Sequence, residues 1–94
     1  MTDRATIAAG LRRLGEEGRP ASEAAHWVLR HTRETGEDLS AFQLMIHFFA
    51  TYQVPVEHLR ELELWEGLGT GGSMTDAELD AVVGPLRVRE TPPS

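Results

Sequence analysis

The stretch from residue 39 to residue 53 constrains the fold most, because it has the period of a helix but is apolar over most of its circumference. At 100° per residue, five apolar residues converge on one side and two more widen that side: Phe42, Met45, Ile46, Phe49 and Tyr52, with Leu44 and Phe48. Only four positions form a polar strip: Ser40, Gln43, His47 and Thr51. We therefore expect a buried central helix, with the remaining segments packed around it.

The remaining segments also favour helices. Residues of about 3–16 carry a narrow apolar stripe, and a second helix is predicted from Pro20 to about Glu34. Pro55 starts a fourth helix, in which Leu59, Leu62 and Trp65 share one face. Two capping boxes, in which a hydroxyl and a side chain three residues later satisfy each other's free amides, are predicted at Ser40 with Gln43 and at Thr75 with Glu78. The predicted fold class is therefore all-α, a compact bundle of four to five short helices around the central apolar helix.

The length of the chain, 94 residues, fits one domain. Residues 67–73 are rich in glycine and are interpreted as a flexible tether to a short last helix, which Gly84 and Pro85 end. We expect residues 1–86 to form a single helical domain and residues 87–94, with two consecutive prolines, to be a disordered tail.

Cysteine usage and the amino terminus indicate a compartment. The chain has no Cys, so no disulfide or thiolate metal site can support the small core. Its first residues lack a basic segment followed by an apolar one, and no run approaches about 20 apolar residues. The sequence predicts a soluble, cytoplasmic protein with no membrane contact.

Charge is distributed unevenly along the chain. Residues 1–33 carry a net charge of +2 and residues 34–94 a net charge of −8, which gives the total of −6. A phosphate backbone repels such a chain, so the balance argues against nucleic acid as the partner. An acidic surface suits a basic protein instead.

One spacing typical of cofactor-binding loops is present, but the segments predicted around it do not fit such a site. Gly67, Gly69 and Gly72 match the spacing G-x-G-x-x-G of dinucleotide-binding loops, but a predicted helix precedes them where a strand is needed. Two acids, Asp76 and Glu78, already occupy the helix start where phosphate would have to lie. We interpret the glycines as a linker and predict no cofactor.

Metal and catalytic sites are not indicated either. No two of the four histidines are spaced i,i+4, the spacing that places two metal ligands on one helical face. Glu23 and His26 form one Glu-x-x-His, but a helical di-metal site needs a second copy. No Ser is matched with a base and an orienting acid. We predict no catalytic and no metal-binding residue, and no enzyme.

Surface residues that could anchor a partner are therefore of more interest. Trp27 with Arg30 forms one candidate, and Leu64 within an acidic surround forms another. The alternative is that Trp27 belongs to the core and Leu64 is an ordinary exposed residue. The complete set of partner-binding candidates is Trp27, Arg30, Glu57, Glu61, Leu64 and Trp65. Excess apolar surface on the central helix would also permit a homodimer.

No motif assigns the chain to a family. In general character, its short amphipathic helices and acidic carboxyl-terminal half resemble small helical bacterial immunity proteins, which neutralise a toxin by presenting carboxylates to its basic active-site cleft. The first functional hypothesis is therefore a non-enzymatic module that binds another protein, with an immunity or antitoxin protein as its sharpest version.

Two other hypotheses remain. One is a helix-turn-helix-like DNA-binding regulator formed by residues 21–54, with Arg30 and Arg33 towards phosphate. The other is a small metal-binding protein or enzyme.

Overall fold

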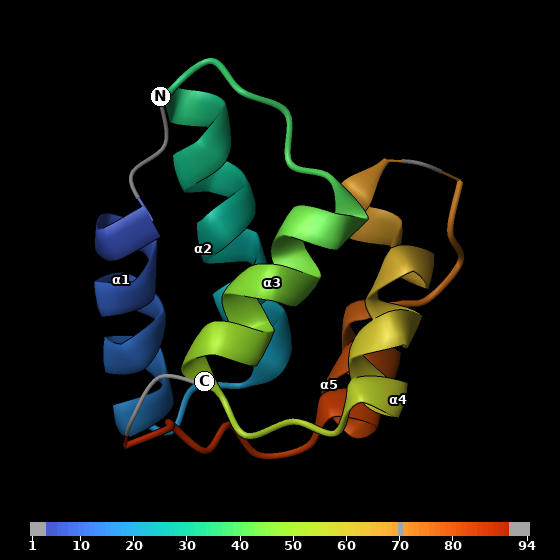
Figure 1. Ribbon diagram of the computed structural model, residues 1–94. Helices are drawn as coiled ribbons and strands as arrows, with labels where there is room; N and C mark the ends of the chain where they lie inside the picture. The colour runs from blue at the N-terminus through green and yellow to red at the C-terminus, as the bar shows by residue number, and fades with distance from the viewer. Residues whose placement is uncertain (1–3, 70, 91–94) are drawn as a thin grey trace.

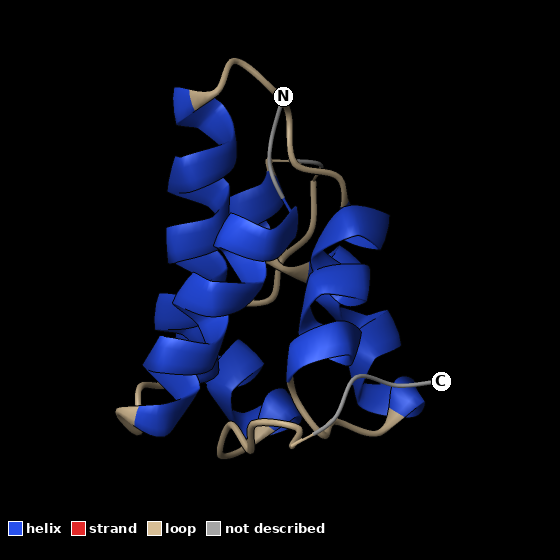
Figure 2. Cartoon of the chain, turned by 60° about the vertical axis from the view of Figure 1, so that its left-hand side comes forward, coloured by secondary structure: helices blue, strands red, loops and turns tan. Residues whose placement is uncertain are grey.

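The computed structural model describes residues 4–69 and 71–90, and the regular elements in that part of the chain are all helices (Figures 1 and 2). The bounds are α1 Arg4–Glu16, α2 Ala21–Glu34, α3 Ala41–Thr51, α4 Val56–Leu59, α5 Asp76–Val83, and the 3-10 helices η1 Arg60–Leu64 and η2 Glu66–Leu68. The predicted all-α class is confirmed.

Both predicted capping boxes are present. The Ser40 hydroxyl accepts from the Gln43 backbone N–H, and the Gln43 side chain accepts from the Ser40 N–H, each at 3.1 Å. Thr75 and Glu78 make the same reciprocal pair at the start of α5. Because these bonds satisfy amides that a helix leaves free in its first turn, they fix where α3 and α5 begin.

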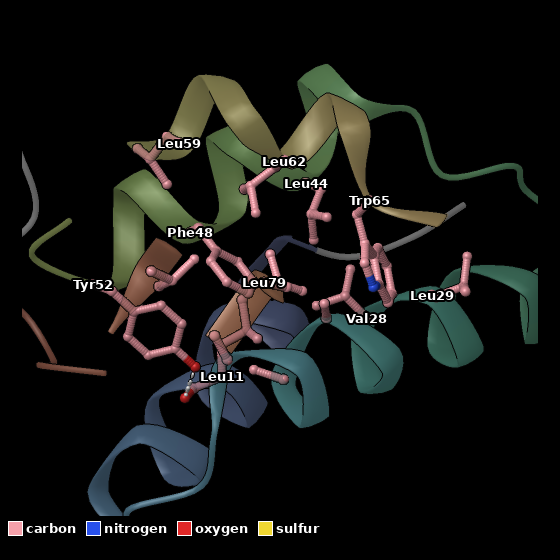
Figure 3. Close-up of a cluster of buried hydrophobic side chains, with 14 of the residues drawn as sticks. Leu11, Val28, Leu29, Leu44, Phe48, Tyr52, Leu59, Leu62, Trp65 and Leu79 are labelled. Carbon is pink, nitrogen blue, oxygen red and sulfur yellow. Dashed lines mark hydrogen bonds between the residues drawn. The ribbon is translucent and has the colours of Figure 1, made fainter. Parts of the chain in front are cut away.

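α3 lies in the middle of the bundle (Figure 1). It packs against α1 and against the α4–η1 segment, whereas α2 packs against α1 and α5. Leu44, Phe48 and Tyr52 extend from α3 into the core shared by these elements (Figure 3). The buried Tyr52 hydroxyl donates to the carbonyl of Leu11 at 2.5 Å, which ties the end of α3 to α1.

The side of α3 that was predicted to face the core differs from the observed side by a rotation of about one residue, or about 100°, about the helix axis. The structure buries Leu44, Phe48 and Thr51, the last of which was assigned to the polar strip. Phe42 and Phe49, expected inside, are 69% and 39% exposed. Because α3 is apolar on nearly every side, its sequence does not determine which side faces inward. The packing of α3 against α1 and the α4–η1 segment determines it.

The segment after Pro55 is less regular than predicted. One α-helix through Trp65 was expected, but α4 has only four residues and continues as the 3-10 helices η1 and η2. Leu59, Leu62 and Trp65, which were predicted to share one face, are nevertheless all buried.

The glycine-rich segment differs from a free tether. Backbone bonds of 2.9 Å join Met74 N–H to the Leu64 carbonyl and Glu66 N–H to the Met74 carbonyl. A Cβ atom on Gly72 would lie 2.2 Å from the Leu64 carbonyl oxygen, so only glycine allows this approach. Residues 72–74 are thus held against η1, while residue 70 lies outside the described residues.

The expected disordered tail from residue 87 also differs from what is seen. Residues 87–89 run antiparallel to residues 51–53, with Gln53 N–H donating to the Arg87 carbonyl and Arg89 N–H donating to the Thr51 carbonyl, both at 2.8 Å. Residues 87–89 therefore pair with the end of α3. Residues 91–94 lie outside the described residues.

Candidate interaction surface

One face of α3 points away from the core and is apolar. Phe42, Met45, Ile46 and Phe49 are spaced i, i+3, i+4 and i+7, which places them on one side of the helix. Phe42 and Phe49 are exposed, and Met45 and Ile46 are half-buried between them. These four side chains form a continuous ridge.

The start of α4 extends this ridge into a surface. Val56 is 56% exposed, and Leu59 lies beneath it in the core. An open hollow of about 210 Å³ between α3 and α4 is lined by Met45, Ile46, Phe49, Val56, Leu59 and Arg60. We use the term apolar face for Phe42, Met45, Ile46, Phe49 and Val56.

Two guanidinium groups border the apolar face. Arg60 is exposed and lines the hollow from the α4–η1 side. Arg89 lies at Phe49, where its Nε donates to the Phe49 carbonyl at 2.7 Å and its guanidinium carbon lies 4.9 Å from the centre of the Phe49 ring. This cation–π contact fixes the position of the Arg89 charge beside the apolar side chains.

Trp65 was predicted to bind a partner, and this prediction is wrong. Its side chain is 0% exposed, and its indole Nε1 donates to Asp76 Oδ1 at 2.8 Å. The His26 ring lies edge-on to the indole, and His26 Nε2 is 2.8 Å from Asp76 Oδ2. The Trp65 hydrogen bond, followed by that of His26, holds the pKa of Asp76 below its usual value. The cluster joins α2, α5 and the η1–η2 junction, so it has a structural role.

The remaining predicted residues are accessible but do not form one surface. Trp27 is half-buried and stacks on His31. Its ring lies so close to Gly10 of α1 that a Cβ atom at that position would clash with it, so Trp27 faces α1. Arg30 is exposed on α2.

The other predicted group lies elsewhere, on α4 and η1. Glu57, Glu61 and Leu64 are all exposed there, Leu64 by 51%. None of these three side chains lines the hollow beside the apolar face.

Sequence reasoning missed Phe42, Phe49 and Val56 as surface residues. The available signal was an excess: a helix of 11 residues with apolar groups on nearly all sides has more apolar surface than a small bundle can cover. That excess indicated an uncovered side without identifying it.

Polar side chains inside the fold are paired with one another. In the described part of the chain, every buried side-chain nitrogen or oxygen has a hydrogen-bond partner, and no three His, Asp or Glu residues are grouped as metal ligands. Asp80 illustrates this pairing, because it accepts from the Ser22 backbone N–H at 2.7 Å and from the Ser22 hydroxyl at 3.1 Å. This bond caps the amino terminus of α2 from α5.

Comparison with protein-family models, with curated proteins and with solved structures found no match to this chain. Among residues 4–69 and 71–90, no helix is both long enough and apolar enough to cross a membrane. What the chain does must therefore be inferred from its own surface.

Proposed function

We propose that this chain is a small, non-enzymatic helical module that binds another protein through the apolar face. The observation that carries the proposal is Phe42, a large apolar side chain that is 69% exposed at the end of a ridge of other apolar groups. Isolated exposed apolar residues are ordinary, but contiguous apolar patches on small proteins mark interaction sites. Fully burying a Phe side chain contributes about 1.5–3 kcal/mol, so Phe42 and Phe49 together could anchor a partner.

The absence of enzymatic activity is part of the proposal. It is supported by the engagement of polar side chains with each other, as in the Asp76 and Asp80 clusters at the α2–α5 junction. These hydrogen bonds engage the polar groups in joining α2 to α5, although Ser22 and His26 also line an open hollow beside α2.

The DNA-binding alternative has less support. In a helix-turn-helix unit formed by residues 21–54, α3 would enter the major groove, yet its 11 residues include no Arg or Lys and its outward side is apolar. α2 packs chiefly on α1 and α5, and α3 packs on α1 and α4–η1, so the two helices are not each other's main contacts. The exposed Arg30 and Arg33 are on α2.

A basic toxin as the partner remains a prediction from net charge. A total charge of −6 would speed the approach of a basic protein. Contacts at the apolar face itself do not depend on that charge, so an immunity or antitoxin role is one version of the broader proposal.

Affinity capture with matched variants tests the proposal. We expect the wild-type chain to retain a stoichiometric protein from a lysate of its source organism, and Phe42→Ser with Phe49→Ser to lose it while keeping a helical circular dichroism spectrum. Leu64→Ser is the control, because it removes an exposed apolar residue outside the apolar face. Equal capture by all three proteins would refute the role of the face. Salt-sensitive binding of duplex DNA at low ionic strength would favour the regulator instead.

A further inference from the structure

We infer that the occupant of the apolar face is an amphipathic helix of the partner protein, with carboxylate side chains beside its apolar stripe. This inference rests on the proposed function and specifies the chemistry of the partner at the same surface. It is carried by the shape of the face and by the two cations at its edges.

The shape suits a helix. From Phe42 to Phe49 the ridge covers seven residue steps, about 10 Å along the α3 axis at 1.5 Å per residue. Beside it, Val56 and Arg60 form the far wall of the hollow, so the surface is elongated and shallow. A second helix can place apolar residues spaced i, i+3, i+4 and i+7 along such a surface, which is a recurrent mode of peptide recognition.

The charges of Arg60 and Arg89 determine which polar side chains of the partner helix can lie beside its apolar stripe. Arg60 and Arg89 lie at the α4–η1 side and at the Phe49 end, and no carboxylate of the described residues forms an ion pair with either guanidinium. Glu57 lies close to Arg60 in the sequence and Glu90 follows Arg89, and both carboxylates are exposed. Neither forms an ion pair with these guanidinium groups. Arg89 has one N–H engaged with the Phe49 carbonyl, which leaves other N–H donors of the same planar group for a carboxylate.

A second copy of the chain fits this face less well. Two copies related by a two-fold axis would each bring Arg60 and Arg89 to the rim of a common apolar contact. Four guanidinium groups would then gather around a contact from which solvent is being excluded, and such an excess of like charge is unfavourable. A partner that presents carboxylates has no such conflict.

Two synthetic peptides test the inference. Both are fluorescent helices of about 18 residues with the same Leu and Phe stripe, long enough to form a marginally stable helix in water. The positions beside the stripe are Glu in one peptide and Lys in the other. In anisotropy titrations at low salt we expect the Glu peptide to bind at least about 10-fold more tightly, which corresponds to about 1.4 kcal/mol.

Charge reversal assigns the preference to the face. We expect Arg60→Glu to remove most of the advantage of the Glu peptide. Arg30→Glu should leave it unchanged, because it alters the net charge by the same two units on α2. Phe42→Ser should weaken the binding of both peptides, and all variants should retain the wild-type circular dichroism spectrum.

Three results would overturn the inference. Equal affinity for both peptides would show that the edges do not select carboxylates, and binding of neither would show that the face does not accept a helix. A dimer in sedimentation velocity that Phe49→Ser dissociates would make a second copy the occupant. The capture experiment with the Phe42 and Phe49 variant decides the proposed function separately, because it does not depend on what the partner presents.

Discussion

The two sides of α3 have similar hydrophobicity and opposite environments. Leu44 and Phe48 on one side are fully buried, whereas Phe42 and Phe49 on the other are exposed. The difference lies in what each side meets, since the inner side faces α1 and the α4–η1 segment across a closed core. Apolar character thus shows that a side chain can be buried, and the neighbouring elements decide whether it is.

Specific contacts also distinguish the inner side. The Phe48 and Tyr52 rings meet edge to face, with centroids 5.2 Å apart and an interplanar angle of 88°. Burial raises the pKa of the Tyr52 hydroxyl, which remains protonated and donates to the Leu11 carbonyl. On the outer side, the described contact of comparable geometry is the one between Arg89 and Phe49.

The largest expected effect is the difference in the free energy of unfolding between two variants, each of which truncates a phenylalanine on one side of α3. Phe48→Ala should lower the free energy of unfolding by about 3–5 kcal/mol, because it removes buried surface and leaves a cavity. Phe42→Ala should change it by no more than about 0.5 kcal/mol, because the ring is mostly in solvent. Urea denaturation followed by circular dichroism measures both values. Similar losses for the two variants would contradict the orientation of α3.

A smaller effect is expected at the inner end of α3. Tyr52→Phe keeps the ring against Phe48 but removes the hydroxyl bond to the Leu11 carbonyl, at a cost of about 1 kcal/mol. The same denaturation experiment measures it. Gln53→Ala, next to Tyr52 but exposed, is the control and should leave stability within about 0.5 kcal/mol. A Tyr52→Phe variant as stable as the wild type would indicate that the bond adds nothing.

The smallest effect should be a pH dependence at the border between the two sides. Burial, and then the charge of Arg4, lower the pKa of His47 below its ordinary value of 6.5. The unfolded chain therefore takes up this proton first as the pH falls. The contribution of the neutral His47 imidazole to the free energy of unfolding is fully present above pH 6.5 and is lost progressively below it.

Replacing the imidazole isolates this dependence. The loss of wild-type stability between about pH 7 and pH 5 should be shallower in His47→Gln, which does not titrate. His58→Gln is the matched control, because His58 is exposed on α4. Identical slopes for the wild type and His47→Gln would show that the ring is not desolvated as described.

Features encoded by neighbouring residues could be predicted from the sequence. Ser40 with Gln43 and Thr75 with Glu78 are only three residues apart, so local chemistry alone fixes both helix starts. The stripe on α1 was equally clear, because Ile7 is flanked by polar or small residues and only one side could face the core.

Features that depend on distant residues could not be predicted. Trp65 is covered through contacts with His26 and Asp76, and His26 and Asp76 are 50 residues apart in the chain. The side of α3 that faces inward depends likewise on where α1 and α4–η1 lie. The burial of Trp65 and the exposed side of α3 were therefore not predicted, although excess apolar surface on α3 was recognised.

The antiparallel pairing of residues 87–89 with residues 51–53 affects the order in which the protein can assemble. Arg12 Nη1 of α1 donates to the Arg89 carbonyl at 3.1 Å, a contact between residues 77 positions apart. During synthesis the first helix emerges long before this partner exists, and closing so long a loop delays folding. Until residue 89 has emerged from the ribosome, α1 and the end of α3 are joined through Tyr52 but lack the further contacts of residues 87–89, so the nascent chain is more open there to proteases and chaperones.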